Sequence, residues 1–177
     1  IGRYQTYGFS PQAQWRIEKI YSGEGFTTFD VSFKGLVLKE LKINLPGRFN
    51  VLNATAALAT AMFLGVKPAV ISDALAKFSG VKRRFEFIGE RQGVKLYDDY
   101  AHHPEEIKAI IGAARDSFPQ KRLIVVFQPH TYSRTKALFD DFTRAFRGAN
   151  IVLMTDVYSS AREKDDLGVI GKLLAQS

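Results

Sequence analysis

Strand-like and helix-like segments alternate along the second half of the chain, and this order constrains the fold more than any other feature. Val94–Asp99, Leu123–Phe127 and Ile151–Thr155 are short and strand-like, and the last two are apolar enough to be buried strands. Between them, Pro104–Phe118 and Arg134–Phe146 carry apolar residues at helical spacing. A β-α-β-α-β order favours a parallel sheet with right-handed crossovers. We therefore predict an α/β fold with flanking helices for this half.

The first 80 residues have a different pattern. Segments rich in aromatic and β-branched residues alternate with turn signals and predict antiparallel strands over Tyr4–Tyr7, Ala13–Ile20, Thr27–Phe33 and Leu36–Leu45. Two helices are predicted next, over residues 50–65 with Asn50 as the N-cap and over Pro68–Phe78. Phe85–Glu90 and the strand after it are predicted to flank a turn at Gln92-Gly93.

The change of pattern near residues 80–84 predicts a domain boundary. We assign residues 1–82 to the end of one domain and 83–177 to an incomplete doubly wound domain, because three parallel strands make a thin sheet. Since the first residue is Ile1 rather than Met, the chain is expected to start inside a longer protein.

Composition limits the classes of function. The 177 residues include no cysteine, which excludes a thiol nucleophile and a cysteine-ligated metal and fits a reducing compartment. No apolar run approaches the roughly 20 residues needed to span a bilayer. The net charge of +7 suits anionic partners such as nucleotides or phosphorylated substrates. A nucleic-acid surface is disfavoured, because the basic residues are scattered and not interleaved with aromatics.

All three histidines lie in loops that follow predicted parallel strands. His102 and His103 follow the first strand, His130 follows the second, and a third loop covers residues 156–162. Ligands of open parallel sheets bind beyond the carboxyl ends of the strands. The three loops are therefore predicted to open on one edge of the sheet and to form a site.

Ordinary structural roles remain open for the charged residues of these loops. Asp98 and Asp99 could end a strand and cap a turn, and His103 could be a helix N-cap. Arg134 could simply pair with a carboxylate such as Asp140.

The other two histidines also have simpler interpretations. His102 and His130 could be surface residues, or they could join Asp99 in a transition-metal site. Their spacing matches no zinc signature, so we predict no metal site.

A second candidate site begins at the first predicted helix. Asn50 and Asn53 lie three residues apart, so their amides can share one face and match the donor and acceptor edge of adenine. The alternative is a helix cap plus a polar surface residue. Lys82-Arg83-Arg84 could hold ribose or phosphate, or could merely be solvated. No G-x-x-x-x-G-K-[ST] loop is present, so the chain lacks the usual triphosphate-binding loop.

Several motifs, in order along nearly the whole chain, resemble the Mur ligase family. Leu45-Pro-Gly-Arg-Phe-Asn50-Val-Leu-Asn53 is similar to the segment after the central ATPase sheet, and Gly80-Val-Lys-Arg-Arg84 to the hinge into the C-terminal domain. The signatures of the L-alanine-adding members are similar to Asp98-Asp-Tyr-Ala-His-His-Pro104, Phe127-Gln-Pro-His-Thr-Tyr-Ser-Arg-Thr135, Leu153–Tyr158 and Ala161–Lys164.

The resemblance implies a cytoplasmic, ATP-dependent ligase of peptidoglycan precursor synthesis, with antiparallel strands and helices ending a central domain before a Rossmann-like C-terminal domain. The full enzyme would join L-alanine to the lactyl carboxylate of UDP-N-acetylmuramate, activated by ATP and Mg²⁺ as an acyl phosphate. By position, the ATP-binding residues would be Asn50, Asn53, Arg84 and Asp99. The substrate-binding residues would be Tyr100, His102, His130 and Arg134, of which the last three would be catalytic by stabilising developing charge.

The resemblance has limits. The main phosphate and Mg²⁺ ligands are expected outside this chain, so the chain alone is predicted to be inactive. Phe49 stands where the family usually has His, Thr131 where it often has Arg, and Ala101 where it commonly has Gly. Two alternatives remain: a murein tripeptide ligase, which the Gln128–Arg134 loop argues against, and a non-catalytic nucleotide-binding or interaction module.

Overall fold

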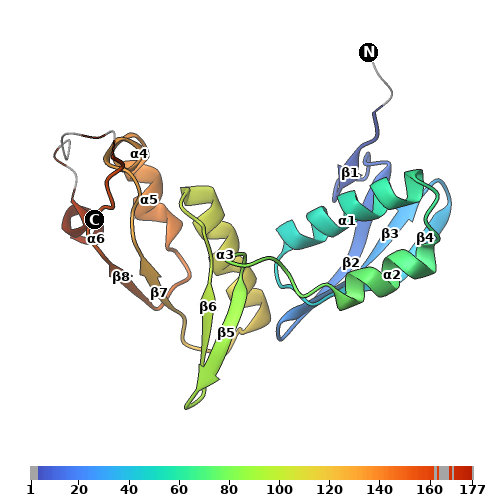
Figure 1. Ribbon diagram of the computed structural model, residues 1–177, viewed down its shortest axis with the longest axis horizontal. Coiled ribbons are helices and arrows are strands. Elements are labelled where there is room, and N and C mark those ends of the chain that lie inside the picture. The colour runs from blue at the N-terminus through green and yellow to red at the C-terminus, as the bar shows by residue number, and fades with distance from the viewer. Residues whose placement is uncertain (1–3, 162, 164–167, 169, 177) are drawn as a thin grey trace. The chain divides into compact units, whose positions relative to one another are not determined.

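The computed structural model describes residues 4–161, 163, 168 and 170–176. The chain forms two compact units (Figure 1). The first comprises residues 1–99 with 116–118, and the second comprises residues 100–115 with 119–177.

A four-stranded sheet forms the base of the first unit. Its strands, in spatial order, are β1 (Tyr7–Gly8), β2 (Trp15–Gly23), β3 (Phe26–Phe33) and β4 (Leu36–Ile43). The pairs β2–β3 and β3–β4 are antiparallel, as predicted. The prediction is wrong for the first strand, since β1 runs parallel to β2. Residue alternation does not encode strand direction, and here residues 9–14 lead the chain back so that β2 starts beside the start of β1.

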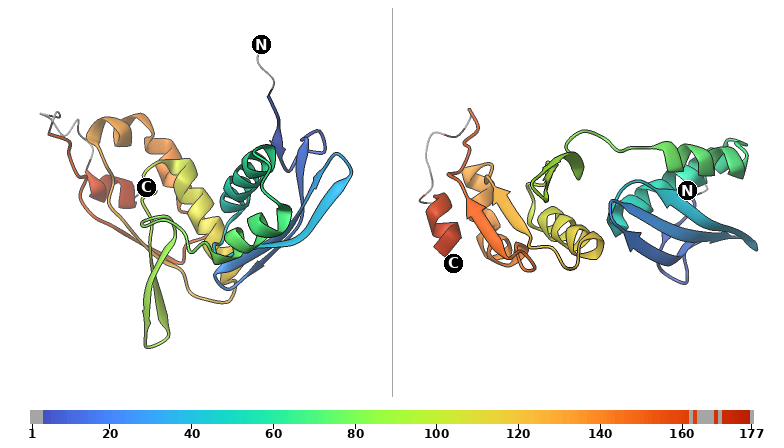
Figure 2. Two further views of the ribbon diagram at one scale, coloured as in Figure 1. Left: turned by 45° about the vertical axis from the view of Figure 1, so that its right-hand side comes forward. Right: turned by 90° about the horizontal axis from the view of Figure 1, so that it is seen from below.

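Two helices cover one face of this sheet (Figure 2). They are α1 (Arg48–Phe63) and α2 (Pro68–Lys77). Their buried side chains Val51, Leu58 and Ile71 join a core with the inward side chains of the strands, including Phe29 and Val31. This shared apolar layer holds the sheet and the helices together.

The first helix starts earlier than the sequence predicts. Gly47, at φ 94°, is the N-cap, and the helix begins at Arg48, so the assignment of Asn50 as the N-cap is wrong. A positive φ is accessible to glycine, and it turns the chain directly from β4 into the helix. Asn50 is therefore buried inside the first turn, where its Nδ2 donates to the Pro46 carbonyl at 2.8 Å.

The predicted hairpin is confirmed. Strands β5 (Glu86–Arg91) and β6 (Val94–Asp98) are antiparallel around Gln92 and Gly93, which both have positive φ. In the described part of the chain β6 pairs with β5 only, so its predicted place in the parallel sheet is wrong. The sequence pattern predicts the order of the strands along the chain. Which strands form hydrogen bonds with each other depends on how closely their backbones approach in space.

The second unit contains the parallel sheet. Its elements are α3 (Pro104–Ser117, which ends at the boundary between units), β7 (Ile124–Phe127), α4 (Tyr132–Ala137), α5 (Phe139–Ala145), β8 (Ile151–Met154) and α6 (Gly171–Gln176). β7 and β8 pair in parallel, as the α/β prediction requires. The sequence also predicts a last helix over Asp165–Gln176; α6 forms its second half, and residues 165–167 and 169 lie outside the described residues.

One predicted helix, Arg134–Phe146, is in fact two. Leu138 leaves the helical region at φ −114° and ψ 21°, and its carbonyl accepts the first hydrogen bonds of α5. Asp140 and Asp141 stand in the first turn of α5, where acidic residues favour a helix start. The apolar stripe continues across the break, so periodicity alone does not reveal it.

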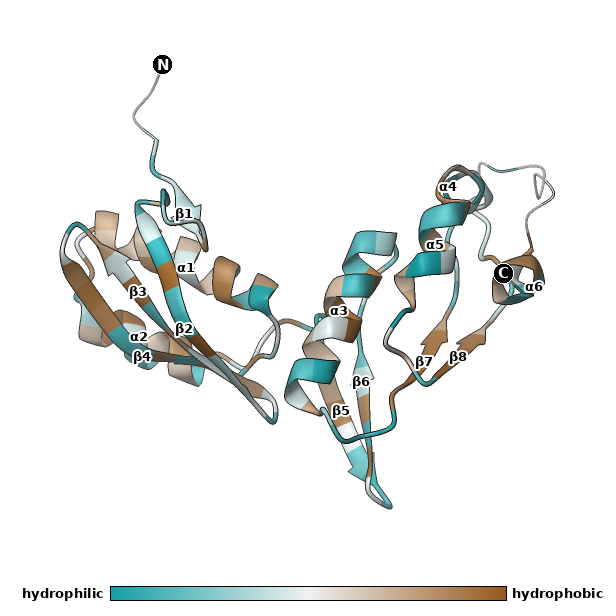
Figure 3. Cartoon of the chain, turned by 180° about the vertical axis from the view of Figure 1, so that it is seen from behind, coloured by the Kyte–Doolittle hydropathy of each residue, from teal (hydrophilic) through white to brown (hydrophobic). Residues whose placement is uncertain are grey.

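The core of this unit covers only one face of the parallel strands. Phe127 and Phe142 are buried in it, together with apolar residues of α3 and α6. On the other face Val126 is 68% exposed and Leu153 52% exposed, so the prediction of buried strands is wrong for that face. Both strands are strongly apolar, as Figure 3 shows. No helix among the described residues is long and apolar enough to cross a membrane.

Candidate functional site

The loop after β6 is organised by a glutamate of the next helix. The carboxylate of Glu106 accepts hydrogen bonds from the backbone N–H of His102 at 3.0 Å and of His103 at 3.1 Å. The His103 carbonyl accepts the bond from Ile107 that opens α3. This is the glutamate half of a capping box, with His103 at the N-cap position. Ala101 packs against the core of the second unit, so the loop is held at both ends.

His102 has a defined ring orientation in this loop. Its Nδ1 lies 2.9 Å from the Tyr100 carbonyl oxygen, and the two rings meet edge to face at 5.2 Å. Because a carbonyl oxygen only accepts, this contact requires the proton on Nδ1. The neutral ring then keeps Nε2 as its acceptor.

The loops after β7 and β8 lie together, as predicted. Backbone bonds from Thr155 to the Phe127 carbonyl (3.0 Å) and from Tyr158 to the Pro129 carbonyl (2.8 Å) extend the parallel pairing beyond the strands. The ring of His130 lies 5.4 Å from that of Tyr158. His130 therefore sits at the carboxyl edge of the parallel pair, where ligands bind in open α/β sheets.

Arg134 turns back toward the same loop. Its Nη1 donates to the His130 carbonyl at 2.6 Å, and the side chain is half-buried. Among the described residues it forms no ion pair with Asp140, so the simpler interpretation has no support there. The contact fixes the guanidinium beside His130 and leaves further N–H donors for an anionic group.

Glu163 is a residue that sequence reasoning missed. Its carboxylate accepts hydrogen bonds from Tyr132, Ser133 and Ser160. These bonds, those from Ser133 foremost, lower the pKa of Glu163 from 4.5 to about 2. The available signal was its place in the Ala161–Lys164 motif.

The four residues predicted to bind ATP lie in the first unit. Asn50 is buried and uses one amide hydrogen on Pro46, whereas Asn53 is exposed on the same helix. Arg84 is exposed, and one oxygen of Asp99 accepts a hydrogen bond from the N–H of Phe85 at 2.7 Å. The amide of Asn53 is therefore more accessible to a ligand than that of Asn50. Asp99 fixes the backbone next to Arg84.

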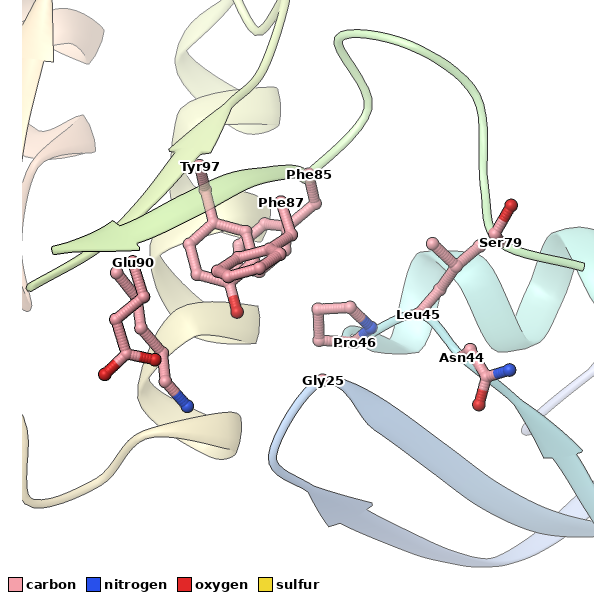
Figure 4. Close-up of a pocket in the computed structure, with 10 residues that line it drawn as sticks. Gly25, Asn44, Leu45, Pro46, Ser79, Phe85, Phe87, Glu90 and Tyr97 are labelled. Carbon is pink, nitrogen blue, oxygen red and sulfur yellow. The ribbon is translucent and has the colours of Figure 1, made fainter. Parts of the chain in front are cut away.

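A pocket of about 300 Å³ adjoins these residues within the first unit (Figure 4). Its walls include Asn44, Pro46, Phe85, Phe87, Lys95 and Tyr97. None of the four predicted residues lines it, but Pro46 and Phe85 are the hydrogen-bond partners of Asn50 and Asp99. The described residues include no group of three or more histidine and carboxylate side chains that could hold a metal ion.

Comparison with known proteins identifies the family. Residues 83–174 match the description "Mur ligase, glutamate ligase domain", and residues 2–61 match "Mur ligase middle domain". The chain belongs to the Mur ligase family. The predicted boundary between residues 82 and 83 stays a prediction, since the compact units divide after Asp99.

Three relatives illustrate the similarity. UDP-N-acetylmuramate–L-alanine ligase of Solidesulfovibrio magneticus is 49% identical over 97% of this chain and 37% of its own length. The crystal structure of UDP-N-acetylmuramate-alanine ligase from Thermotoga maritima matches with a TM-score of 0.81 and 30% identity, covering 97% of this chain and 36% of that one. A murein peptide ligase from Psychrobacter arcticus gives a TM-score of 0.53 and 28% identity, covering 84% and 31%. This Mur ligase chain therefore spans little more than a third of the length of its curated relative.

Proposed function

We propose that this chain is part of a UDP-N-acetylmuramate–L-alanine ligase. The observation that carries the proposal is the 49% identity, over nearly the whole chain, to a ligase of that name. The structural match to the Thermotoga maritima ligase, with a TM-score of 0.81 against 0.53 for the murein peptide ligase, also supports it.

The reaction proceeds in two steps. The lactyl carboxylate of UDP-N-acetylmuramate attacks the γ-phosphorus of ATP, which forms an acyl phosphate and releases ADP. The amine of L-alanine then attacks the acyl carbon and loses a proton, and the tetrahedral intermediate expels inorganic phosphate. Mg²⁺ would accompany ATP, and we propose that its protein ligands lie in the part of the full-length relatives that this chain does not match.

We propose that the second unit supplies the groups that act on the reacting atoms. Arg134, held beside His130, is proposed to stabilise negative charge on the transferring phosphoryl group. His102, with its Nδ1 proton committed to the Tyr100 carbonyl, is proposed to accept the amine proton at Nε2. Both histidine loops are fixed by carboxylate contacts to their backbones, which suits groups that must be positioned before reaction.

The first unit supplies the nucleotide contacts. Asn53 and Arg84 are exposed, and Arg84 has no side-chain partner among the described residues. An exposed amide and an exposed guanidinium fit a nucleoside and its ribose side. We propose that Asn50 and Asp99 shape this region, through Pro46 and Phe85, as much as they contact ATP.

The test is product formation by the full-length protein that contains this chain. With ATP, Mg²⁺ and UDP-N-acetylmuramate, we expect mass spectrometry to detect the L-alanine adduct and ADP. The same protein should give no adduct with the tripeptide L-alanyl-D-glutamyl-diaminopimelate. Efficient use of the tripeptide in place of L-alanine would favour a murein peptide ligase, and binding of ATP without any adduct would favour a non-catalytic module.

A further inference from the structure

We propose that Glu163 is a positioning residue that holds the His130 loop in its working shape by joining the third loop to the start of α4. The proposal rests on the proposed function, because it assigns Glu163 to the same site. Glu163 acts through other residues, and we do not place it in contact with substrate.

Both oxygens of the Glu163 carboxylate are engaged. Oε1 accepts from the N–H of Ser133 at 2.9 Å and from its Oγ at 2.7 Å. Oε2 accepts from the N–H of Tyr132 at 3.0 Å and from the N–H of Ser160 at 3.3 Å. One side chain thus binds two segments that are about thirty residues apart in the chain.

These bonds provide acceptors for backbone N–H groups at the start of α4. Tyr132 and Ser133 are the first two residues of the helix, whose opening N–H groups have no partner inside it. The N-cap residue, Thr131, makes no side-chain capping bond. A carboxylate at this end also complements the helix dipole. Glu163 therefore caps α4 from a distant loop.

The cap bears directly on His130 and Arg134. Both residues flank the capped turn, and the Arg134 guanidinium donates to the His130 carbonyl across it. On the other side, Tyr158 from the third loop faces the His130 ring. Without the Glu163 hydrogen bonds, the loops after β7 and β8 keep their backbone hydrogen bonds to each other. They lose the contact that fixes the conformation of the first turn of α4.

The ionised state of Glu163 supports this role. Hydrogen bonds from Ser133, with further ones from Tyr132 and Ser160, hold the pKa of the carboxyl at about 2. The group is therefore charged throughout the range in which such an enzyme is assayed, and the tie does not depend on pH there.

The experiment compares Glu163→Gln and Glu163→Asp with wild type in the full-length protein. Glutamine keeps the size but loses the charge, whereas aspartate keeps the charge on a shorter side chain. Asp73→Asn is the matched control, because Asp73 is an exposed residue of α2 that pairs only with Lys77 among the described residues and its change removes the same charge.

For Glu163→Gln we expect kcat to fall by about tenfold or more, since a displacement of about 1 Å can cost a hundredfold. The KM for ATP should change less than twofold. Glu163→Asp should recover part of the rate. Ser133→Ala combined with Glu163→Gln should lose less than the product of the two single losses, because both changes break the same contact. Asp73→Asn should match wild type.

A second readout separates positioning from general destabilisation. In protein labelled with ¹⁵N-serine, the amide signals of Ser133 and Ser160 should shift in Glu163→Gln and stay in place in Asp73→Asn. Unchanged signals together with wild-type kcat would overturn the proposal, as would a loss of rate that Asp73→Asn shares. Failure of the proposed function would look different, because wild type itself would then form no L-alanine adduct.

Discussion

Arg115 at the end of α3 ties together three segments of the second unit. Its Nε donates to the Gly148 carbonyl at 2.6 Å, its Nη1 to the Lys121 carbonyl at 2.8 Å and its Nη2 to Asn150 Oδ1 at 2.5 Å. The same Asn150 oxygen accepts from the N–H of Leu123 at 2.8 Å, at the entry to β7. We predict that Arg115→Met selectively destabilises the second unit.

The magnitude follows from these contacts. A hydrogen bond contributes about 1 kcal/mol net, and more when one partner is charged. The Arg115 side chain is half-buried, so solvent recovers part of the loss. Three bonds then amount to about 2–3 kcal/mol of unfolding free energy. Because about 1.4 kcal/mol is a factor of ten, amide exchange limited by opening of this unit should accelerate about 30- to 150-fold.

Amide hydrogen exchange followed by mass spectrometry is the assay, since it resolves the two units by peptide. Peptides from β7 and β8 should accelerate by the stated factor, whereas peptides from β2 and β3 should not. Arg122→Met is the control, because Arg122 is exposed and its side chain forms no hydrogen bond or ion pair with the described residues. Equal acceleration in both variants, or none in Arg115→Met, would show that the Arg115 contacts do not stabilise the second unit.

Three further predictions concern the core, the nucleotide and pH. Leu58 is fully buried, so Leu58→Ala should lower the free energy of unfolding by about 3 kcal/mol, as followed by the fluorescence of Trp15 in the same core. Arg84→Ala should raise the KM for ATP about tenfold in full-length protein with little change in kcat, and the exposed Arg91→Ala should leave it unchanged. Because the pKa of Glu163 is lowered to about 2, its contribution to the free energy of unfolding is complete above about pH 4.5 and is lost as the pH falls toward about 2. In Glu163→Gln the free energy of unfolding should therefore depend less on pH between these values. An unchanged pH dependence would contradict the assignment.

The sequence predicts those parts of the fold that depend on the conformation of a few neighbouring residues. The β5–β6 hairpin could be predicted because Gln92-Gly93 provides the positive φ that a tight turn requires. The break at Leu138 could not, because apolar residues continue on both sides of it. The parallel direction of β1 and the pairing of β6 depend on backbone positions that periodicity does not encode.

In the candidate site, too, the sequence predicts the position of a residue on its strand or loop but not its contacts with distant segments. The strand and helix order placed His130 at the carboxyl edge of the parallel pair, and the structure puts it against Tyr158 there. The contacts of Glu163 were not predictable, because they join segments about thirty residues apart and depend on the path of the third loop. The orientation of His102 likewise rests on a carbonyl contact that no residue pattern specifies.

We propose that the histidine-bearing loops serve the transfer of L-alanine to an activated carboxylate. The most direct test measures L-alanine-dependent phosphate release by the full-length protein and by its His130→Ala variant. We expect release by wild type that requires both UDP-N-acetylmuramate and L-alanine, and a loss of about a hundredfold or more in the variant. Equal rates for the two proteins, or release by wild type that is indifferent to L-alanine, would contradict it.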